Sequence, residues 1–361
     1  MIYYITLIAL YVLGFYNVYS DNKKYITRLL VLALCWLVLH DGLRWETATD
    51  WTNYYRFFVG CLQLNLDNIY FEKGYVFSNV LVRYLTDDYT VYLLLHAACV
   101  YTLIGITLKK YAAYPLLSLA LFYALMLGYL GMNRQYITLA IAFFSIRFII
   151  ERQLYPFIAC MIIGMLFHNS AIIFAMAYFL TKPYKRIIYI VVLAVFFLIS
   201  MSGIIRMLPL ELFYIAGSDM GDKMDTYNYL GNESISMASQ LMGIMKRMIW
   251  IVIVLIYYDA FKKVENFALF FNLYFIALCL YLLFNNTPLQ VIVARGILSL
   301  NLFEIMIMPM ILFVFKDNET RKICFAGFVV YGFMIMLKAI NTYVEVNGED
   351  IFNPYRCVLF E

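Results

Sequence analysis

Arginines that interrupt long apolar stretches are the residues in this sequence best suited to chemistry, and the chemistry they suit is phosphate binding. A guanidinium donates paired hydrogen bonds to a phosphate and stays charged at physiological pH. A charge at the bilayer centre costs on the order of 2.5–3.5 kcal/mol, so such residues usually face a polar interior or a substrate path. Each one alone can also snorkel to lipid headgroups. As a set, they favour an anion site. They are Arg44, Arg134, Arg247 and Arg295.

Arg134 lies in a segment that gives a second reason to expect phosphate. Residues 131–135 read Gly-Met-Asn-Arg-Gln and separate two apolar stretches, which indicates a helix start with Asn133 as its cap and Gln135 beside it. A helix N-terminus presents unpaired N–H groups and the positive end of the helix dipole to an anion. The alternative is a plain polar turn between two helices.

Residues 44–55 place an arginine, two carboxylates and several aromatic residues next to a predicted membrane boundary. Aromatic faces such as that of Tyr54 suit sugar rings. The carboxylates of Glu46 and Asp50 can bind hydroxyl groups or accept a proton. An aromatic belt at a helix end is the alternative, although a belt does not require the acids. We therefore favour a sugar-handling role.

His168 is the third candidate for acid–base chemistry, because it separates two short apolar stretches. A lone histidine is more often a structural hydrogen-bonding residue than a catalyst, so both readings stay open. The cysteines are scattered and form no cluster with metal-ligand spacing. The nucleotide-phosphate, zinc-protease and dinucleotide signatures are absent from the sequence. We expect neither a metal nor a cofactor.

The composition of the whole chain is that of a membrane protein. Of 361 residues, 65% are hydrophobic and 14% are charged, whereas about a quarter are charged in a typical soluble domain. Apolar stretches long enough to cross roughly 30 Å of hydrocarbon recur throughout. We expect an all-α polytopic membrane protein with about 12 transmembrane helices, forming one integral membrane domain over residues 1–361. The predicted helices cover residues 1–20, 25–43, 88–108, 113–131, 134–150, 154–167, 169–181, 186–206, 239–258, 265–284, 289–315 and 322–341. Residues 70–85 are too polar to span and predict a surface or re-entrant helix.

Lysines and arginines in alternate short loops predict the orientation, because such residues concentrate on the cytoplasmic side. Both termini and the long loops 43–87 and 207–238 then lie outside, where we expect the loops to form part of an active site. The four interrupting arginines come to a similar depth on that outer side. In a bacterium this predicts the inner membrane, with chemistry facing the periplasm or exterior. The cytoplasmic set is Lys23, Lys24, Arg28, Lys109, Lys110, Arg152, Lys182, Lys185, Arg186, Lys262, Lys263, Lys316, Arg321 and Lys322.

The ordered motifs resemble those of the EpsG family of polysaccharide polymerases, relatives of the Wzy O-antigen polymerases. The chain departs from the family at Ala48, where a glycine often precedes Thr-Asp. The blocks that carry the resemblance are Gly42-Leu43-Arg44 with Thr49-Asp50 and Tyr54; Gly131-Met132 with Arg134-Gln135 and Ala140; Phe167-His168-Asn169-Ser170-Ala171; and Arg295-Gly296.

The resemblance implies a metal-independent glycosyltransferase. It would move a glycan from undecaprenyl diphosphate onto another lipid-linked repeat unit, in the synthesis of exopolysaccharide, capsule or lipopolysaccharide. The implied partners are the lipid-linked donor and acceptor, the bilayer, a chain-length regulator and a flippase, and no nucleic acid. We expect Asp50, His168, Arg134 and Arg247 to be catalytic, with Asp50 the first choice as base, His168 the second and Glu46 the third. The implied substrate-binding residues are Arg44, Arg295, Glu46, Tyr54, Asn133 and Gln135.

Two other functions remain open at this point. An O-antigen ligase-like transferase would use the same donor and the same arginines with a different acceptor. A lipid-linked oligosaccharide flippase or other transporter would predict an inverted repeat and a charged path through the whole membrane. The sequence shows no such repeat.

Overall fold

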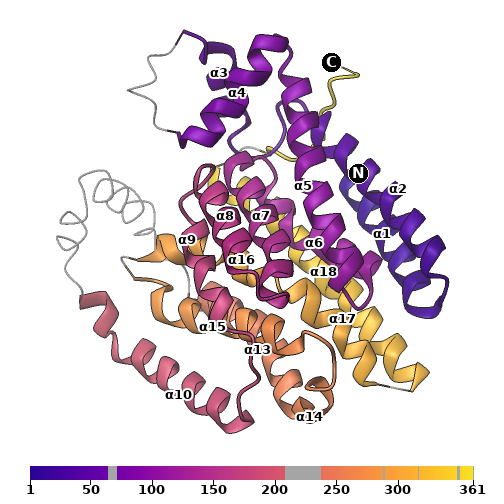
Figure 1. The fold of residues 1–361 in the computed structure, drawn as a ribbon, viewed down its shortest axis with the longest axis vertical. Helices are drawn as coiled ribbons and strands as arrows, with labels where there is room; N and C mark the ends of the chain where they lie inside the picture. Colours follow the sequence, from indigo (N-terminus) through magenta and orange to yellow (C-terminus); the bar gives the residue numbers. More distant parts are fainter. Residues whose placement is uncertain (64–70, 208–236, 288, 316, 348–349, 361) are drawn as a thin grey trace. The chain divides into compact units, whose positions relative to one another are not determined.

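The computed structural model describes residues 1–63, 71–207, 237–287, 289–315, 317–347 and 350–360. Over these ranges the chain is helical and forms no strand beyond an isolated antiparallel bridge between Arg44 and Cys357 (Figure 1). The helices gather into two compact units, residues 1–172 with 308–361, and residues 173–307. The predicted single domain of residues 1–361 stays a prediction.

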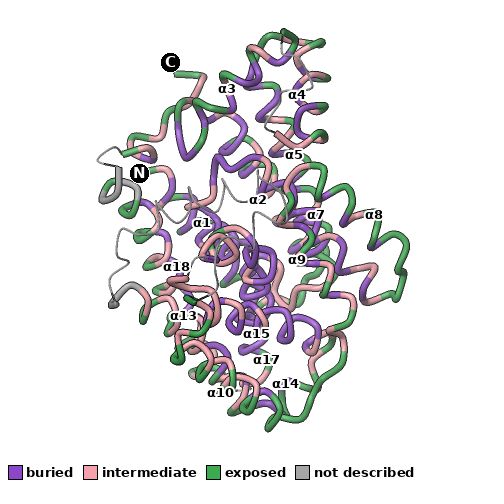
Figure 2. Tube along the Cα trace, turned by 90° about the vertical axis from the view of Figure 1, so that its left-hand side faces the viewer, coloured by how far each residue is buried: buried purple, intermediate pink, exposed green. Residues whose placement is uncertain are grey.

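The first unit is built around α6, of which nearly every residue is buried, whereas α8 exposes much of its length (Figure 2). α1 and α18 pack on α6, α2 packs on α5, and α7 lies between α5 and α8. The outward faces of α1 and α8 carry exposed isoleucines and leucines, as lipid-facing helices do. Its helices are α1 (Ile2–Tyr19), α2 (Lys23–Gly42), α3 (Trp51–Gly60), α4 (Lys73–Leu85), α5 (Tyr89–Tyr111), α6 (Pro115–Met126) with η2 (Leu127–Tyr129), α7 (Asn133–Ile150), α8 (Leu154–Met165) and α18 (Asn318–Asn347).

α2 and α5 are antiparallel and closely packed. Gly42 of α2 lies against Leu94 near the start of α5, and Gly105 near the end of α5 lies against Leu34. The Asp88 carboxylate accepts the Thr90 N–H at 2.8 Å and caps the start of α5. The C-terminal end of α2 therefore lies beside the N-terminal end of α5.

The second unit is built around α15, which packs against α10, α13, η5 and α16 and is largely buried. α9 and α17 carry the chain between the two units. Its elements are η3 (Ala175–Phe179), α10 (Arg186–Ser202), η4 (Ile204–Met207), α13 (Met237–Ile256), α14 (Tyr258–Phe261), α15 (Phe267–Phe284), the π-helix η5 (Ile292–Gly296) and α16 (Leu298–Asn301), with α9 (Ala171–Phe174) and α17 (Glu304–Val314) at its limits.

The expectation of a helical membrane protein is confirmed. Among the described residues, helices over Ile2–Tyr19, Lys23–Gly42, Tyr89–Tyr111, Phe267–Phe284 and Asn318–Thr342 are long and apolar enough to cross a bilayer. Shorter apolar helices accompany them at Pro115–Tyr129, Leu154–Met165, Arg186–Ser202 and Leu298–Val314.

Three elements differ from the prediction. The stretch 289–315 is not one helix, because it is divided into η5, α16 and α17 around Arg295-Gly296 and the residues after Asn301. The stretch 169–181 is one turn of α-helix followed by a 3₁₀ segment. Helix α3 was not predicted, whereas the short helix expected near 70–85 is present as α4. Most of the predicted outer loop 207–238, residues 208–236, lies outside the described residues.

Candidate functional site

The segment joining α2 to α3 adopts a backbone that L-residues rarely take. Glu46, Ala48 and Asp50 have φ values of 43°, 75° and 56°. Left-handed backbone costs a non-glycine residue roughly 1–2 kcal/mol, and such strain persists only where the surroundings enforce it. Ala48 thus occupies a conformation that glycine favours.

The C-terminal tail holds one side of this segment. The Ala48 N–H donates to the Ile351 carbonyl at 2.8 Å, and the Trp45 N–H donates to the Arg356 carbonyl at 3.0 Å. Thr47 Oγ1 accepts the Arg356 N–H at 3.1 Å. The tail therefore fixes the strained turn from a position about 300 residues away in sequence.

The turn before α7 holds the other side. Thr49 donates both its N–H and its hydroxyl to the Leu130 carbonyl, at 3.3 and 3.1 Å. Gly131 has φ of 98°, and a Cβ atom on it would overlap the Thr49 carbonyl oxygen. Only glycine fits there.

We expect Gly131→Ala to destabilise the protein by roughly 2 kcal/mol or more, because the added methyl group meets both an unfavourable φ and a backbone oxygen. Thermal unfolding of the purified protein in detergent measures this. Gly203→Ala is the matched control, since Gly203 has φ of 69° with open space around a Cβ; it should cost only about 1 kcal/mol. If both substitutions lowered the unfolding temperature equally, the Thr49 carbonyl oxygen would not be what excludes a side chain at position 131.

Arg44 is buried and holds elements together. Its side chain donates through Nη1 to the Asp41 carbonyl at 2.5 Å and through Nη2 to Asn133 Oδ1 at 2.8 Å. Asn133 Nδ2 donates in turn to the Tyr89 hydroxyl at 3.2 Å. Asn133 is therefore not the cap of α7, as the sequence predicted; Met132 takes that position without a side-chain bond. With 3% exposure, Arg44 joins α7 to α2, and its predicted role in substrate binding stays a prediction.

A buried polar network accompanies Arg44 and was not predicted. Asp41 accepts hydrogen bonds from His40 Nδ1 at 2.8 Å and from the Tyr101 hydroxyl at 2.5 Å. The Tyr355 hydroxyl donates to the His40 carbonyl, and burial raises the pKa of Tyr355, which stays a neutral donor. A buried cation needs such compensation. The sequence signal was an adjacent histidine and aspartate in the last turn of an apolar helix.

Arg134, at the start of α7, forms an ion pair that sequence reasoning missed. Its Nη1 donates to Glu72 Oε2 at 2.5 Å, and its Nε donates to the Tyr54 hydroxyl at 3.3 Å. The guanidinium lies 4.6 Å from the centre of the Phe71 ring. The Arg134 and Glu72 side chains are 17% and 16% exposed. Nη2 has no hydrogen bond within the described residues, so it remains able to donate to a ligand.

Two aromatic rings lie beside the Arg134 guanidinium, with ring centres 4.6 Å away for Phe71 and 5.9 Å away for Tyr54. On the same helix as Tyr54, Tyr55 stacks on Trp51 with ring centres 4.9 Å apart, and Trp45 meets Trp51 edge-on at the same distance. Trp51 is buried, whereas Phe71, Trp45 and Tyr55 are half-buried. A half-buried aromatic ring beside a cation and a carboxylate is a surface that suits a sugar phosphate.

The carboxylates favoured from the sequence lie elsewhere on the same segment. Asp50 is exposed, and its side chain does not cap α3. Glu46 is exposed and pairs with Arg356 at 2.7 Å. Gln135 is buried beside Asn133 in the first turn of α7.

His168 is half-buried at the end of α8, and its ring orientation bears on its role. Its Nδ1 accepts the Ser170 N–H at 3.1 Å, and a backbone N–H can only donate. The neutral ring is therefore protonated on Nε2 and presents a donor there. This tautomer suits hydrogen bonding to an anion better than proton abstraction.

Arg247 is the centre of a second group, in the second unit. Its Nε donates to Asn301 Oδ1 at 3.2 Å, its Nη1 donates to the Gly243 carbonyl at 2.8 Å, and its guanidinium lies 4.0 Å from the Tyr281 ring centre. A Cβ on Gly243 would overlap the Tyr281 hydroxyl, so glycine allows this stacking. Within the described residues Arg247 forms no ion pair.

The nearby carboxylate is paired with other side chains. Glu304 is 3% exposed, accepts the Trp250 Nε1–H at 3.0 Å and lies 4.0 Å from Lys246 Nζ. Arg295 is half-buried in the π-helix η5, and single-turn π-helices are frequent at functional sites. The second unit thus presents two arginines in addition to a paired lysine.

Among the described residues, no group of three or more histidine, cysteine, aspartate or glutamate side chains could hold a metal ion. The sequence model of one family, described as the EpsG family, matches residues 27–357. No curated protein and no solved structure matches the chain.

Proposed function

Because this chain belongs to the EpsG family, we propose that it is a polysaccharide polymerase of the bacterial inner membrane. It transfers a glycan from undecaprenyl diphosphate onto the free end of another lipid-linked repeat unit. The reaction takes place at the periplasmic or outer face. The half-buried Arg134–Glu72 pair, at the start of α7 beside the rings of Tyr54 and Phe71, is the observation that carries the proposal.

We further propose about 12 spans with both termini outside, from the lysine and arginine pattern. The packing within the first unit supports this orientation. His96 Nε2 contacts the Asn133 carbonyl at 2.8 Å, whereas Lys110 pairs with Glu151 at 2.7 Å at the opposite ends of α5 and α7. Arg134 and the lysines of α5 therefore belong to opposite ends of these helices, as one outer and one cytoplasmic group should.

The chemistry follows from the groups around Arg134. Its unoccupied Nη2 donates to the diphosphate and stabilises the charge that develops as the sugar C1–O bond to phosphate breaks and undecaprenyl diphosphate leaves with the electron pair. The acceptor hydroxyl oxygen bonds to C1 and passes its proton to the Glu72 carboxylate. Trp45 and Tyr55 offer faces for the sugar rings. In the second unit, Arg247 and Arg295 are the proposed further phosphate ligands.

Glu72 replaces Asp50 as the proposed base, because Glu72 lies against the phosphate-binding arginine whereas Asp50 is exposed without a cap bond. We expect Glu72→Gln to lower the rate of chain extension about 100-fold or more, since a general base typically contributes 10²–10⁴-fold. Asp50→Asn is the matched control. Asparagine tolerates the left-handed backbone found there, so its rate should stay within about threefold of the parent. The reverse ranking would return the role of base to Asp50.

The assay uses purified protein in nanodiscs with undecaprenyl-diphosphate-linked repeat units of its own organism, with and without EDTA. Gel and mass analysis should show a ladder spaced by one repeat and release of undecaprenyl diphosphate, unchanged by EDTA. Transfer only onto a lipid A core acceptor would indicate a ligase. An intact donor after incubation with both substrates would favour a transporter or scaffold.

A further inference from the structure

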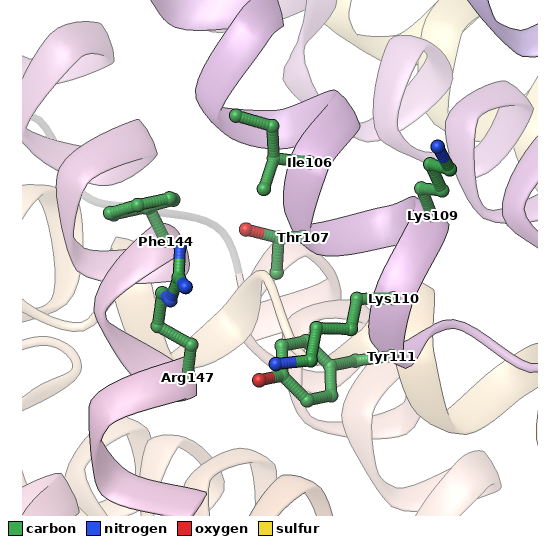
Figure 3. Close-up of a pocket in the computed structure, with 7 residues that line it drawn as sticks. All are labelled: Ile106, Thr107, Lys109, Lys110, Tyr111, Phe144 and Arg147. Carbon is green, nitrogen blue, oxygen red and sulfur yellow. The ribbon is translucent and has the colours of Figure 1, made fainter. Parts of the chain in front are cut away.

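A pocket of about 400 Å³ opens between the last turns of α5 and α7, at the opposite end of these helices from Arg134 (Figure 3). Phe144 and Arg147 of α7 face side chains of α5 across it. The residues that line it include Ile106, Lys109, Lys110, Tyr111, Phe144 and Arg147.

Positive charges outnumber negative charges around this pocket. Of its three cations, Lys110 is paired with Glu151, and this hydrogen bond lowers the pKa of the Glu151 carboxyl, which stays ionised. Lys109 is exposed. Arg147 lies 5.2 and 5.3 Å from the ring centres of Phe144 and Phe148. Its Nε is buried and has no hydrogen-bond partner within the described residues. Glu151 also interacts electrostatically with Arg147, and the Lys109 side chain points away from Arg147 (Figure 3). One carboxylate therefore stands against the two cations, Arg147 and Lys110, that face the pocket.

The other wall of the pocket is apolar and sits at a membrane boundary. α5 is long and apolar enough to cross a bilayer, and Lys109 and Lys110 are in its last turn. Ile106, one turn earlier, is 44% exposed. Phe144 is half-buried on the facing helix. Cations at the level of the headgroups, with an apolar wall extending toward the bilayer interior, match a lipid that carries a negative headgroup.

We propose that this pocket binds the headgroup of an anionic phospholipid, with Arg147 and Lys110, whose side chain extends toward Arg147 (Figure 3), contacting the phosphate and Ile106 and Phe144 contacting the first part of an acyl chain. A hydrogen bond from the buried Arg147 Nε to a phosphate oxygen would satisfy an atom that the protein leaves unpartnered. The pocket includes neither Arg134 nor Glu72, so lipid binding there can be tested independently of the proposed polymerase activity.

Native mass spectrometry of the purified full chain tests the proposal, with phosphatidylglycerol, phosphatidylcholine and inorganic phosphate as the three probes. We expect phosphatidylglycerol adducts that exceed phosphatidylcholine adducts at equal concentration, and no competition by millimolar phosphate. Each lost cation should weaken phosphatidylglycerol binding about fivefold, so Arg147→Gln with Lys110→Gln should weaken it about 25-fold. Lys110→Gln alone guards against misfolding, because the Lys110 side chain is 50% exposed.

Lys24→Gln is the matched control: Lys24 is an exposed cation at the same end of the antiparallel α2–α5 pair, outside the pocket. It should leave the adducts unchanged. Equal binding of the two lipids would overturn the proposal, as would a loss in Lys24→Gln equal to that in Lys110→Gln. Binding of free phosphate that displaces the lipid would reassign the pocket to a soluble anion.

Discussion

Replacing Arg134 with alanine is expected to stop polymer formation, with a fall in chain extension of roughly 10²–10³-fold. Removal of one preorganised donor to a developing negative charge typically costs that much. Arg134 is held by Glu72 and Tyr54 before substrate arrives, and its Nη2 is free of hydrogen bonds within the described residues. The measurement is the initial rate of repeat addition in nanodiscs at saturating donor.

The stability of the variant must be separated from its chemistry. Alanine at 134 leaves the Glu72 carboxylate, 16% exposed, without its cation, which is expected to cost about 1–3 kcal/mol. The double variant Arg134→Ala with Glu72→Ala removes both partners, so it should recover much of the unfolding temperature and none of the activity.

Arg56→Ala is the matched control for the same experiment, because Arg56 is an exposed guanidinium on α3 in the same predicted outer loop. It should extend chains at the parent rate. Normal polymer from Arg134→Ala, or equal loss from Arg56→Ala, would remove Arg134 from the proposed site.

Patterns that depend on local composition were predictable from the sequence, and contacts across the fold were not. Long apolar stretches gave α1, α2, α5, α15 and α18 to within a few residues because bilayer length sets helix length. Helix α3 was missed because its aromatic residues read equally well as a membrane-boundary belt. The stretch 289–315 was read as continuous because its mean hydropathy hides the π-helical turn at Arg295-Gly296.

The candidate site shows the same division. Arginine in an apolar stretch indicates a polar contact, and the sequence found Arg44, Arg134 and Arg247 on that ground. Their burial was not predictable: Arg44 is enclosed by Asp41 and Asn133, whereas Arg134 Nη2 has no hydrogen bond within the described residues. The sequence did not point to Glu72, because Glu72 and its partner Arg134 are 62 residues apart and no spacing rule links them.

The strained turn connects these observations. Three left-handed residues within 46–50 survive because the tail and the turn before α7 both bind this segment. The same bonds set where α3 begins, and α3 carries Tyr54, the hydroxyl that Arg134 Nε contacts. Alanine at position 48 therefore raises the conformational cost of the turn and does not change its backbone path.

Arg247→Ala is expected to lower chain extension by a similar 10²–10³-fold, for a reason the second unit supplies by itself. Asn301, the Gly243 carbonyl and the Tyr281 ring fix the guanidinium, yet no ion pair offsets its charge within the described residues. An uncompensated charge in an apolar helix is costly, and an anionic substrate removes that cost. The assay is again repeat addition in nanodiscs, with donor concentration varied.

Two further substitutions decide whether geometry or charge matters at Arg247. Lysine keeps the charge but lacks the planar fork that bonds Asn301 while stacking on Tyr281, so Arg247→Lys should recover less than a tenth of the activity. Lys246→Ala removes the adjacent cation, which faces Glu304 at 4.0 Å, and should be mild. Full rescue by lysine would mean that Arg247 supplies only a diffuse positive potential. A loss in Lys246→Ala as deep as that in Arg247→Ala would mean that the reaction needs the Lys246–Glu304 pair as much as the guanidinium, and that Arg247 has no special role.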